Sequence, residues 1–173
     1  MEDQMSKISL RPFQLSDIDD FMVWHCDDNV ARFCGWDTCT SKEDGLGRLR
    51  DRTIPHQREK AICLNDRPIG SIGLIQGSGA GLCRAEVGYV LASKYWGQGI
   101  ATHAVKMVVS TVFKEKPGLE RIEATVDVEN VGSQRVLEKV GFKREGLLRK
   151  YLIHKGRTID MFIYSFLSTD SIK

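Results

Sequence analysis

The chain has 173 residues, of which 42% are hydrophobic and 28% are charged, the usual composition of one soluble globular domain. Lys and Arg number 25 against 23 Asp and Glu, and a net charge of +2 excludes binding to nucleic acid through bulk charge. No apolar run is long enough to span a membrane, and residues 1–7 lack the apolar core of a signal peptide. We therefore expect a cytoplasmic protein, monomeric or homodimeric, with no nucleic-acid or membrane partner.

The cysteines and histidines suggest neither a disulfide framework nor a metal site. The five cysteines are odd in number and never spaced as C-x-x-C. The four histidines form no His-x-x-x-His pair of the kind that holds zinc on one helix face. We therefore expect no metal and cysteines that act as small hydrophobic residues.

The apolar pattern predicts an α+β fold in one domain. We expect a flexible N-terminus at 1–7, a domain at 8–167 and a tail at 168–173. Seven segments have the pattern of strands, namely 8–10, 61–64, 69–75, 85–92, 119–128, 142–152 and 158–166. Helices are expected near 18–25, 41–52, 100–113 and 131–140, with Ser16 and Ser41 as N-caps and Gly141 as the last C-cap. A β-α-β unit inside a run of strands indicates one mixed sheet.

The segment before the third of these helices has the features of an anion site. Gly97 and Gly99 follow Tyr95-Trp96 and open the helix that starts near Ile100. Glycines let a ligand approach the backbone, and the free N–H groups of a first helical turn attract phosphate. A Rossmann loop is disfavoured because Thr102 stands where its third glycine belongs, and no Gly-Lys-Ser/Thr of a P-loop follows.

Several motifs in order give this chain a family resemblance. They are Leu10-Arg11-Pro12, the loop from Tyr95 to Thr102, Asn130-x-x-Ser133 and Gly141-Phe142. Together they resemble the GNAT superfamily of N-acetyltransferases over residues 8–166. The local sequence is similar to the RimJ/RimL ribosomal-protein branch and to its plant members. The resemblance implies a mostly antiparallel seven-stranded sheet with splayed central strands, and acetyl-CoA as co-substrate.

The same resemblance implies a set of residues that bind acetyl-CoA. Main-chain groups of the loop would hold the pyrophosphate, and the strand before it would pair with the pantetheine arm. Trp96 departs from the family pattern, which has a polar residue in that position. The implied binding residues are Tyr89, Val90, Leu91, Trp96, Gly97, Gln98, Gly99, Ile100, Ala101, Thr102, Asn130 and Ser133.

The catalytic residues are harder to assign. Many family members carry a tyrosine seven residues after the asparagine as the acid for the leaving thiolate, but Leu137 stands there. Ser133 is the substitute that the RimJ/RimL branch suggests, and its alternative reading is a serine that satisfies helix N–H groups. The base could be Glu86 or Glu123, each acting through water, because Leu152 occupies the position of the glutamate proposed for that role in RimL-like members.

The acceptor follows from the cost of exposing a neutral amine. At pH 7 this costs about 1 kcal/mol for an α-amine with pKa about 7.7–8.0, and about 4.6 kcal/mol for a lysine with pKa about 10.4. A protein or peptide N-terminal α-amine is therefore the preferred acceptor, attacking acetyl-CoA directly in a ternary complex. A small-molecule amine, a non-catalytic acyl-CoA-binding module and a scaffold domain without cofactor stay open as alternatives.

Overall fold

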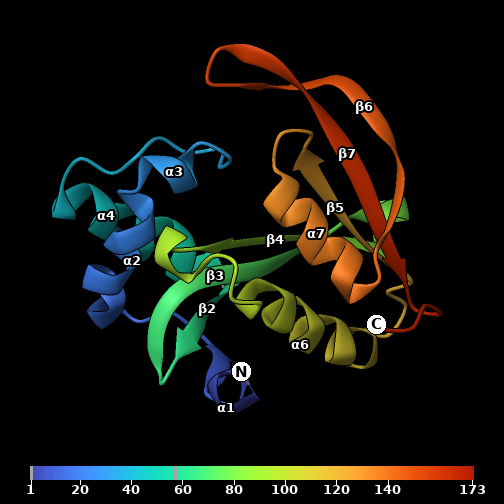
Figure 1. Ribbon diagram of the computed structural model, residues 1–173, viewed down its shortest axis with the longest axis horizontal. Coiled ribbons are helices and arrows are strands. Elements are labelled where there is room, and N and C mark those ends of the chain that lie inside the picture. The colour runs from blue at the N-terminus through green and yellow to red at the C-terminus, as the bar shows by residue number, and fades with distance from the viewer. Residues whose placement is uncertain (1, 57) are drawn as a thin grey trace. The chain divides into compact units, whose positions relative to one another are not determined.

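Figure 1 shows a computed structural model of the chain, which describes residues 2–56 and 58–173. Its strands form one mixed seven-stranded sheet in the order β1-β2-β3-β4-β5-β7-β6, which confirms the expected fold class. The pair β4–β5 is parallel, and β1–β2, β2–β3, β5–β7 and β6–β7 are antiparallel. The strands are β1 (Ile8–Arg11), β2 (Glu59–Leu64), β3 (Arg67–Gln76), β4 (Arg84–Leu91), β5 (Arg121–Asp127), β6 (Lys143–His154) and β7 (Arg157–Leu167).

The helices agree with the expected ones at their centres and differ at their ends. Short helices that the sequence did not indicate are α1, α3 and α5, and a π-helical segment, Leu49–Thr53, continues α4. The full set is α1 (Glu2–Met5), α2 (Ile18–His25), α3 (Asp28–Ala31), α4 (Lys42–Arg48), α5 (Ile54–His56), α6 (Ile100–Glu115) and α7 (Val131–Val140). The chain forms two compact units, Met1–Gly73 with Tyr89–Ala104, and Leu74–Gly88 with Val105–Lys173.

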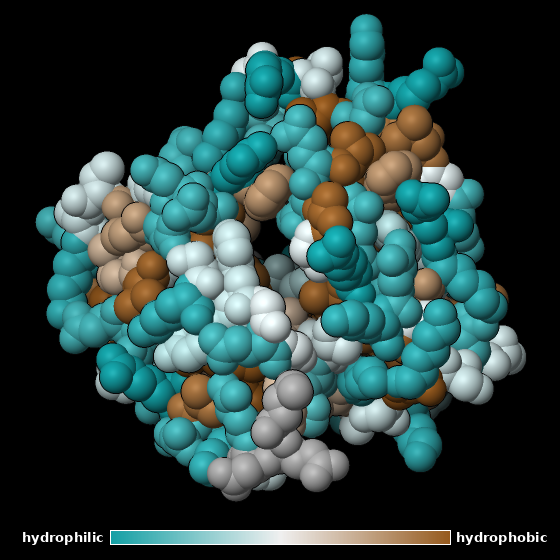
Figure 2. Space-filling model, viewed as in Figure 1, coloured by the Kyte–Doolittle hydropathy of each residue, from teal (hydrophilic) through white to brown (hydrophobic). Residues whose placement is uncertain are grey.

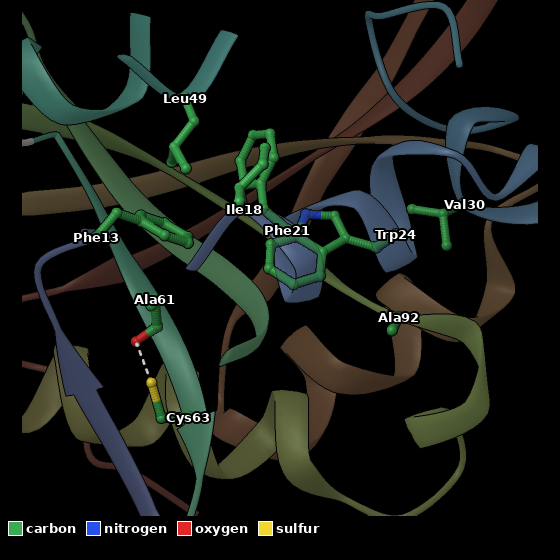
Figure 3. Packing of buried hydrophobic residues seen from close by; sticks show 9 residues of the cluster. All are labelled: Phe13, Ile18, Phe21, Trp24, Val30, Leu49, Ala61, Cys63 and Ala92. Atoms are coloured by element: carbon green, nitrogen blue, oxygen red, sulfur yellow. Dashed lines mark hydrogen bonds between the residues drawn. The ribbon is translucent and has the colours of Figure 1, made fainter. Parts of the chain in front are cut away.

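The first unit has an aromatic core beneath α2. Phe13, Phe21 and Trp24 lie edge to face or tilted, with ring centroids 5.5–6.4 Å apart, and Figure 3 shows them gathered with aliphatic residues of the same cluster. Ser16 was expected to cap α2, but it lies inside a 3-10 turn, Leu15–Asp17. The carboxylate of Asp17 accepts the Gln14 N–H at 2.8 Å instead. Ser41 caps α4 as expected, accepting the Asp44 N–H at 3.1 Å.

The hairpin between β2 and β3 turns on two residues. Asn65 and Asp66 have φ of 51° and 63°, the left-handed pair that a tight two-residue hairpin loop needs. Arg67 and Pro68 lie outside the expected strand 69–75, but both pair with β2. Asn and Asp tolerate positive φ better than most residues do, so the turn contracts onto them.

In the second unit, the burial along β5 and the end of α7 agree with the sequence pattern. Along β5, Ile122, Ala124 and Val126 are buried, and the residues between them are partly exposed. Gly141 ends α7 with φ of 117°, and a Cβ there would come within 3.0 Å of the Ser171 carbonyl oxygen. The Tyr164 hydroxyl on β7 donates to the Glu138 carboxylate on α7 at 3.1 Å, which ties the helix to the strand.

Candidate functional site

The loop between β4 and α6 requires glycine at two positions. Gly97 and Gly99 have φ of 74° and 80°, which side chains other than glycine rarely adopt. Both lie exposed, and a Cβ at Gly97 would meet no atom within 4 Å. The glycines are therefore needed for the backbone path of the loop and not to avoid a neighbouring side chain.

Side chains of the loop bind back onto its own backbone. The Trp96 Nε1–H donates to the Leu91 carbonyl oxygen at 2.9 Å, and Gln98 Nε2 donates to the Lys94 carbonyl oxygen at 3.0 Å. Gln4 Nε2 donates to Gln98 Oε1 at 3.1 Å. The indole of Trp96 thus pins the loop to the end of β4, a structural role for the residue that departs from the family's polar pattern.

The start of α6 is arranged to attract an anion. The His103 N–H donates to the Gly99 carbonyl oxygen at 3.0 Å, so the N–H groups of Ile100, Ala101 and Thr102 come before the first N–H that donates within the helix. The helix has 16 residues, and its first turn contains no acidic side chain. A helix of this length carries about half a positive charge at its N-terminus. The exposed glycines and this helix end therefore fit a phosphate group.

The 3-10 turn before the loop, Ser93–Tyr95, is fixed by a residue that sequence reasoning missed. Asp27 Oδ2 accepts the Ser93 hydroxyl at 2.5 Å, and Asp27 Oδ1 accepts the Asn29 N–H at 2.9 Å at the start of α3. The Ser93 bond, followed by the backbone bonds of α3, holds the pKa of Asp27 below its usual value. No local pattern indicates a bond between residues 66 positions apart, although Asp27 before a helix is a recognisable N-cap.

The end of β4 lies close against β3 because of one glycine. A Cβ at Gly70 would lie 2.1 Å from the Val90 carbonyl oxygen, a distance no side chain tolerates. The Ala92 N–H donates to the Ile69 carbonyl oxygen at 2.9 Å. Tyr89 and Val90 are partly exposed and Leu91 is buried, so β3 holds this segment in place.

The two candidate bases differ sharply in their surroundings. The parallel ladder joins Arg84–Glu86 to Arg121–Glu123, and both strands continue past it. Glu86 is exposed, and its Oε1 accepts the Thr125 hydroxyl at 2.9 Å. Glu123 is 13% exposed at its side chain and binds two guanidinium groups, those of Arg84 and of Arg121, the latter at 2.9 Å. One oxygen of Glu123 goes to each arginine.

Arg121 also binds Glu145, which belongs to β6. Its Nη1 and Nη2 donate to the two carboxylate oxygens of Glu145 at 2.9 and 2.6 Å. This pair, with the Ser165 hydroxyl, lowers the pKa of Glu145 to about 2. Arg84, Arg121, Glu123 and Glu145 thus form one ion-pair network across neighbouring strands, which the sequence did not predict.

The N-terminus of α7 brings together Asn130 and Ser133. Asn130 is the N-cap, and its Oδ1 accepts the Ser133 N–H at 3.1 Å. Asn130 therefore satisfies the helix donors, the role considered for Ser133 as an alternative to catalysis. Ser133 is partly buried in the first turn. Leu137, one turn further on, is completely buried and fills the core where the family's tyrosine would stand.

Residues 7–143 match the family model described as "Acetyltransferase (GNAT) domain". The chain belongs to this family. It is therefore an N-acetyltransferase, as the motifs predicted. "Uncharacterized N-acetyltransferase p20" of Bacillus licheniformis is 31% identical over 173 aligned residues, which cover 95% of this chain and 94% of that one.

Two solved structures are also similar to this N-acetyltransferase. A GNAT-family acetyltransferase from Bacillus anthracis has a TM-score of 0.85 and 26% identity, covering 95% of this chain and 96% of the other. RimJ of Mycobacterium smegmatis, solved in complex with CoA-disulfide, has a TM-score of 0.78 and 28% identity, covering 95% and 85%. RimJ belongs to the branch that the motifs resemble, whereas these bacterial relatives give no support to a likeness with plant members.

The described residues offer neither a metal-binding cluster nor a membrane-spanning helix. Within residues 2–56 and 58–173, no three His, Cys, Asp or Glu side chains are grouped so that they could hold a metal ion. No helix in that part of the chain is long and apolar enough to cross a membrane.

Proposed function

We propose that this N-acetyltransferase moves the acetyl group of acetyl-CoA to the N-terminal α-amine of a protein or peptide. The observation that carries the use of acetyl-CoA is the exposed, positive-φ glycine loop before α6, which fits a pyrophosphate. The CoA ligand of the similar RimJ structure supports the same assignment. Residues 96–102 would hold the pyrophosphate, and Tyr89, Val90 and Leu91 would pair with the pantetheine arm.

The bound thioester supplies an activated acetyl group, and the residues of the chain provide the remaining chemistry. The α-amine attacks the thioester carbonyl carbon, the C–N bond forms, and the C–S bond breaks. A main-chain N–H near Val90 would stabilise the charge on the carbonyl oxygen, as oxyanion donors do. Ser133 would pass a proton to the leaving thiolate sulfur and take one back from water, and Asn130 would hold the helix turn that positions Ser133.

Glu86 is the better of the two candidate bases. A base needs an oxygen that is available to take a proton, and both oxygens of Glu123 are bound to guanidinium groups. Glu86 is exposed, and its Oε1 accepts a hydrogen bond from a neutral hydroxyl, that of Thr125. We propose that Glu86 takes the proton of the amine through water and that Glu123 supports the strand pair.

The replacement of the family's acid and proposed base favours the α-amine as acceptor. The positions of the family's acid and proposed base hold Leu137 and Leu152, and Glu86 is an exposed carboxylate. Such a site can use an amine whose neutral form costs about 1 kcal/mol at pH 7, but not readily one that costs about 4.6 kcal/mol. An N-terminal α-amine meets that condition and a lysine side chain does not.

Matched peptides test the acceptor. One peptide has a free N-terminus and a blocked lysine, and its partner of the same sequence has a blocked N-terminus and a free lysine. Thiol release at pH 7 should be faster with the first. Faster reaction of the lysine peptide would overturn the α-amine assignment, and reaction of neither would leave small amines as acceptors. CoA binding without thiol release from any amine would indicate a non-catalytic acyl-CoA-binding module.

A further inference from the structure

Strand β6 contains an irregularity opposite a single residue of β7. Leu148 pairs with Met161 and Leu152 pairs with Ile159, so three residues, Arg149, Lys150 and Tyr151, stand opposite Asp160 alone. Such a bulge locally redirects side chains of the strand, and bulges are frequent beside functional sites. We call Arg149–Tyr151 the β6 bulge.

The β6 bulge is held in a strained conformation by a specific bond. Lys150 has φ of 48°, in the left-handed region that costs a non-glycine residue about 1 kcal/mol. Asp160 Oδ1 accepts the Lys150 N–H at 2.7 Å, while the Asp160 carbonyl oxygen accepts the Val128 N–H at 3.3 Å. Strain that the surroundings maintain is a recognised mark of a functional position.

The β6 bulge and the end of the β6–β7 hairpin display cations that form no ion pair within the described part of the chain. Arg149, Lys150, Lys155 and Arg157 are exposed, and none of them forms an ion pair with a residue in the described ranges 2–56 and 58–173. In the same unit Arg84, Arg121 and Lys143 are paired. Figure 2 shows hydrophilic side chains projecting at the top of the view, where Figure 1 has this hairpin.

Apolar side chains accompany these cations. Tyr151 is 52% exposed and Ile153 is 74% exposed, both on β6, which is an edge strand of the sheet. A surface that mixes cations with exposed Ile and Tyr suits a polypeptide that carries both acidic and apolar side chains. A nucleic acid is disfavoured, because four cations on a chain of net charge +2 offer few phosphate contacts.

The register places the β6 bulge level with the carboxyl end of β5. Asp127 pairs with Met161, which pairs in turn with Leu148, the residue before the bulge. After Asp127 the chain turns into α7, where Asn130 and Ser133 lie. Two strand spacings separate β6 from β5, about 10 Å. About three residues of an extended peptide span that distance.

We propose that Arg149 and Lys150 bind carboxylate side chains of the acceptor polypeptide a few residues after its reacting amine. The protein then selects acceptors with acidic residues near the N-terminus. This selectivity rests on the proposed function, because it takes the acceptor to be a polypeptide α-amine. Asp160 is a positioning residue in this scheme, since it holds the bulge and does not itself touch the acceptor.

Three peptides that differ only at residues 3 and 4 test the proposal, with Glu-Glu, Gln-Gln or Lys-Lys in those positions. With the wild-type protein at low salt, kcat/KM should be about tenfold higher for Glu-Glu than for Gln-Gln, and lowest for Lys-Lys. Arg149→Ala with Lys150→Ala should abolish the preference, and Arg149→Glu with Lys150→Glu should reverse it. The control, Lys114→Ala at the end of α6 with Lys116→Ala just after the helix, should keep the wild-type preference.

A second pair of variants tests whether the bulge positions the cations. Asp160→Ala removes the acceptor of the Lys150 N–H, and Asp160→Asn keeps an oxygen that can accept it. The preference for Glu-Glu should fall in Asp160→Ala and stay near the wild-type level in Asp160→Asn, although both variants keep Arg149 and Lys150. An equal effect of the two variants would overturn the positioning role of the bulge.

The outcomes separate this proposal from the proposed function. Equal rates for the three peptides would overturn the acidic preference and leave the α-amine function standing. If no peptide reacts, the proposed function fails, and anisotropy of a fluorescent Glu-Glu peptide then tests the surface alone. Binding that the Arg149→Ala, Lys150→Ala variant does not weaken would overturn the proposal. Tighter binding of an RNA oligonucleotide of equal length, lost in that variant, would overturn it as well.

Discussion

Protonation of His25 is expected to destabilise the fold in mildly acidic solution. The imidazole ring stacks between Phe21 and Trp36, with ring centroids 3.9 and 4.6 Å away, and its buried Nδ1 has no hydrogen-bond partner in the described structure. Burial, reinforced by the positive charge of Arg48, lowers the pKa of His25 to about 4. The unfolded chain takes up this proton near pH 6.5, so stability is complete above pH 6.5 and falls as the pH falls toward 4.

The magnitude follows from the shift. A change of one pKa unit is worth about 1.36 kcal/mol, so this group should remove about 2 kcal/mol of the free energy of unfolding between pH 7 and pH 5. Its full contribution, reached below pH 4, is about 3 kcal/mol. The variant His25→Phe keeps an aromatic ring between Phe21 and Trp36 but cannot take up a proton, so it should lack this pH dependence.

Urea unfolding at pH 7, 6 and 5, followed by circular dichroism, measures the effect. The difference in the free energy of unfolding between His25→Phe and wild type should grow by about 2 kcal/mol in favour of the variant as the pH falls from 7 to 5. Taking the difference cancels other groups that titrate in both proteins. Parallel pH profiles of the two proteins would refute the reasoning, as would an NMR titration of the imidazole that gives a midpoint near 6.5.

Three further predictions concern the catalytic site. Gly99→Glu should abolish CoA binding in a calorimetric titration, because it brings negative charge to the proposed pyrophosphate site. Gly99→Ala, which adds only the backbone strain of about 1 kcal/mol, should still bind, and equal losses would point to strain alone. Ser133→Ala should lower kcat more than it raises the KM for acetyl-CoA, because the role proposed for Ser133 is in proton transfer; a change in KM alone would make Ser133 a binding residue. Glu86→Gln should lower kcat at pH 6–7 and less so above pH 8, where the α-amine is already neutral, whereas Glu123→Gln should instead lower the melting temperature by breaking its two ion pairs. The opposite pattern would make Glu123 the base.

Local sequence determined the elements and the glycine loop of this protein. The alternation of Ile122, Ala124 and Val126 set the buried face of β5, and Gly97 and Gly99 marked a turn that only glycine adopts. These features follow from residues within a few positions of one another, because side-chain periodicity and backbone freedom are local properties. The order of the motifs was enough to indicate the family, which the match to residues 7–143 confirms.

Tertiary structure decided which of the chemically capable residues are available to act. Glu86 and Glu123 look alike in the sequence, yet only Glu123 has Arg84 and Arg121 on its two oxygens, since the sheet brings β4 and β5 together. The bond from Ser93 to Asp27 joins residues that are far apart in the chain. Strand register, likewise, put the β6 bulge opposite Asp160. Charge pairing and register depend on which strands become neighbours, and no short stretch of sequence contains that information.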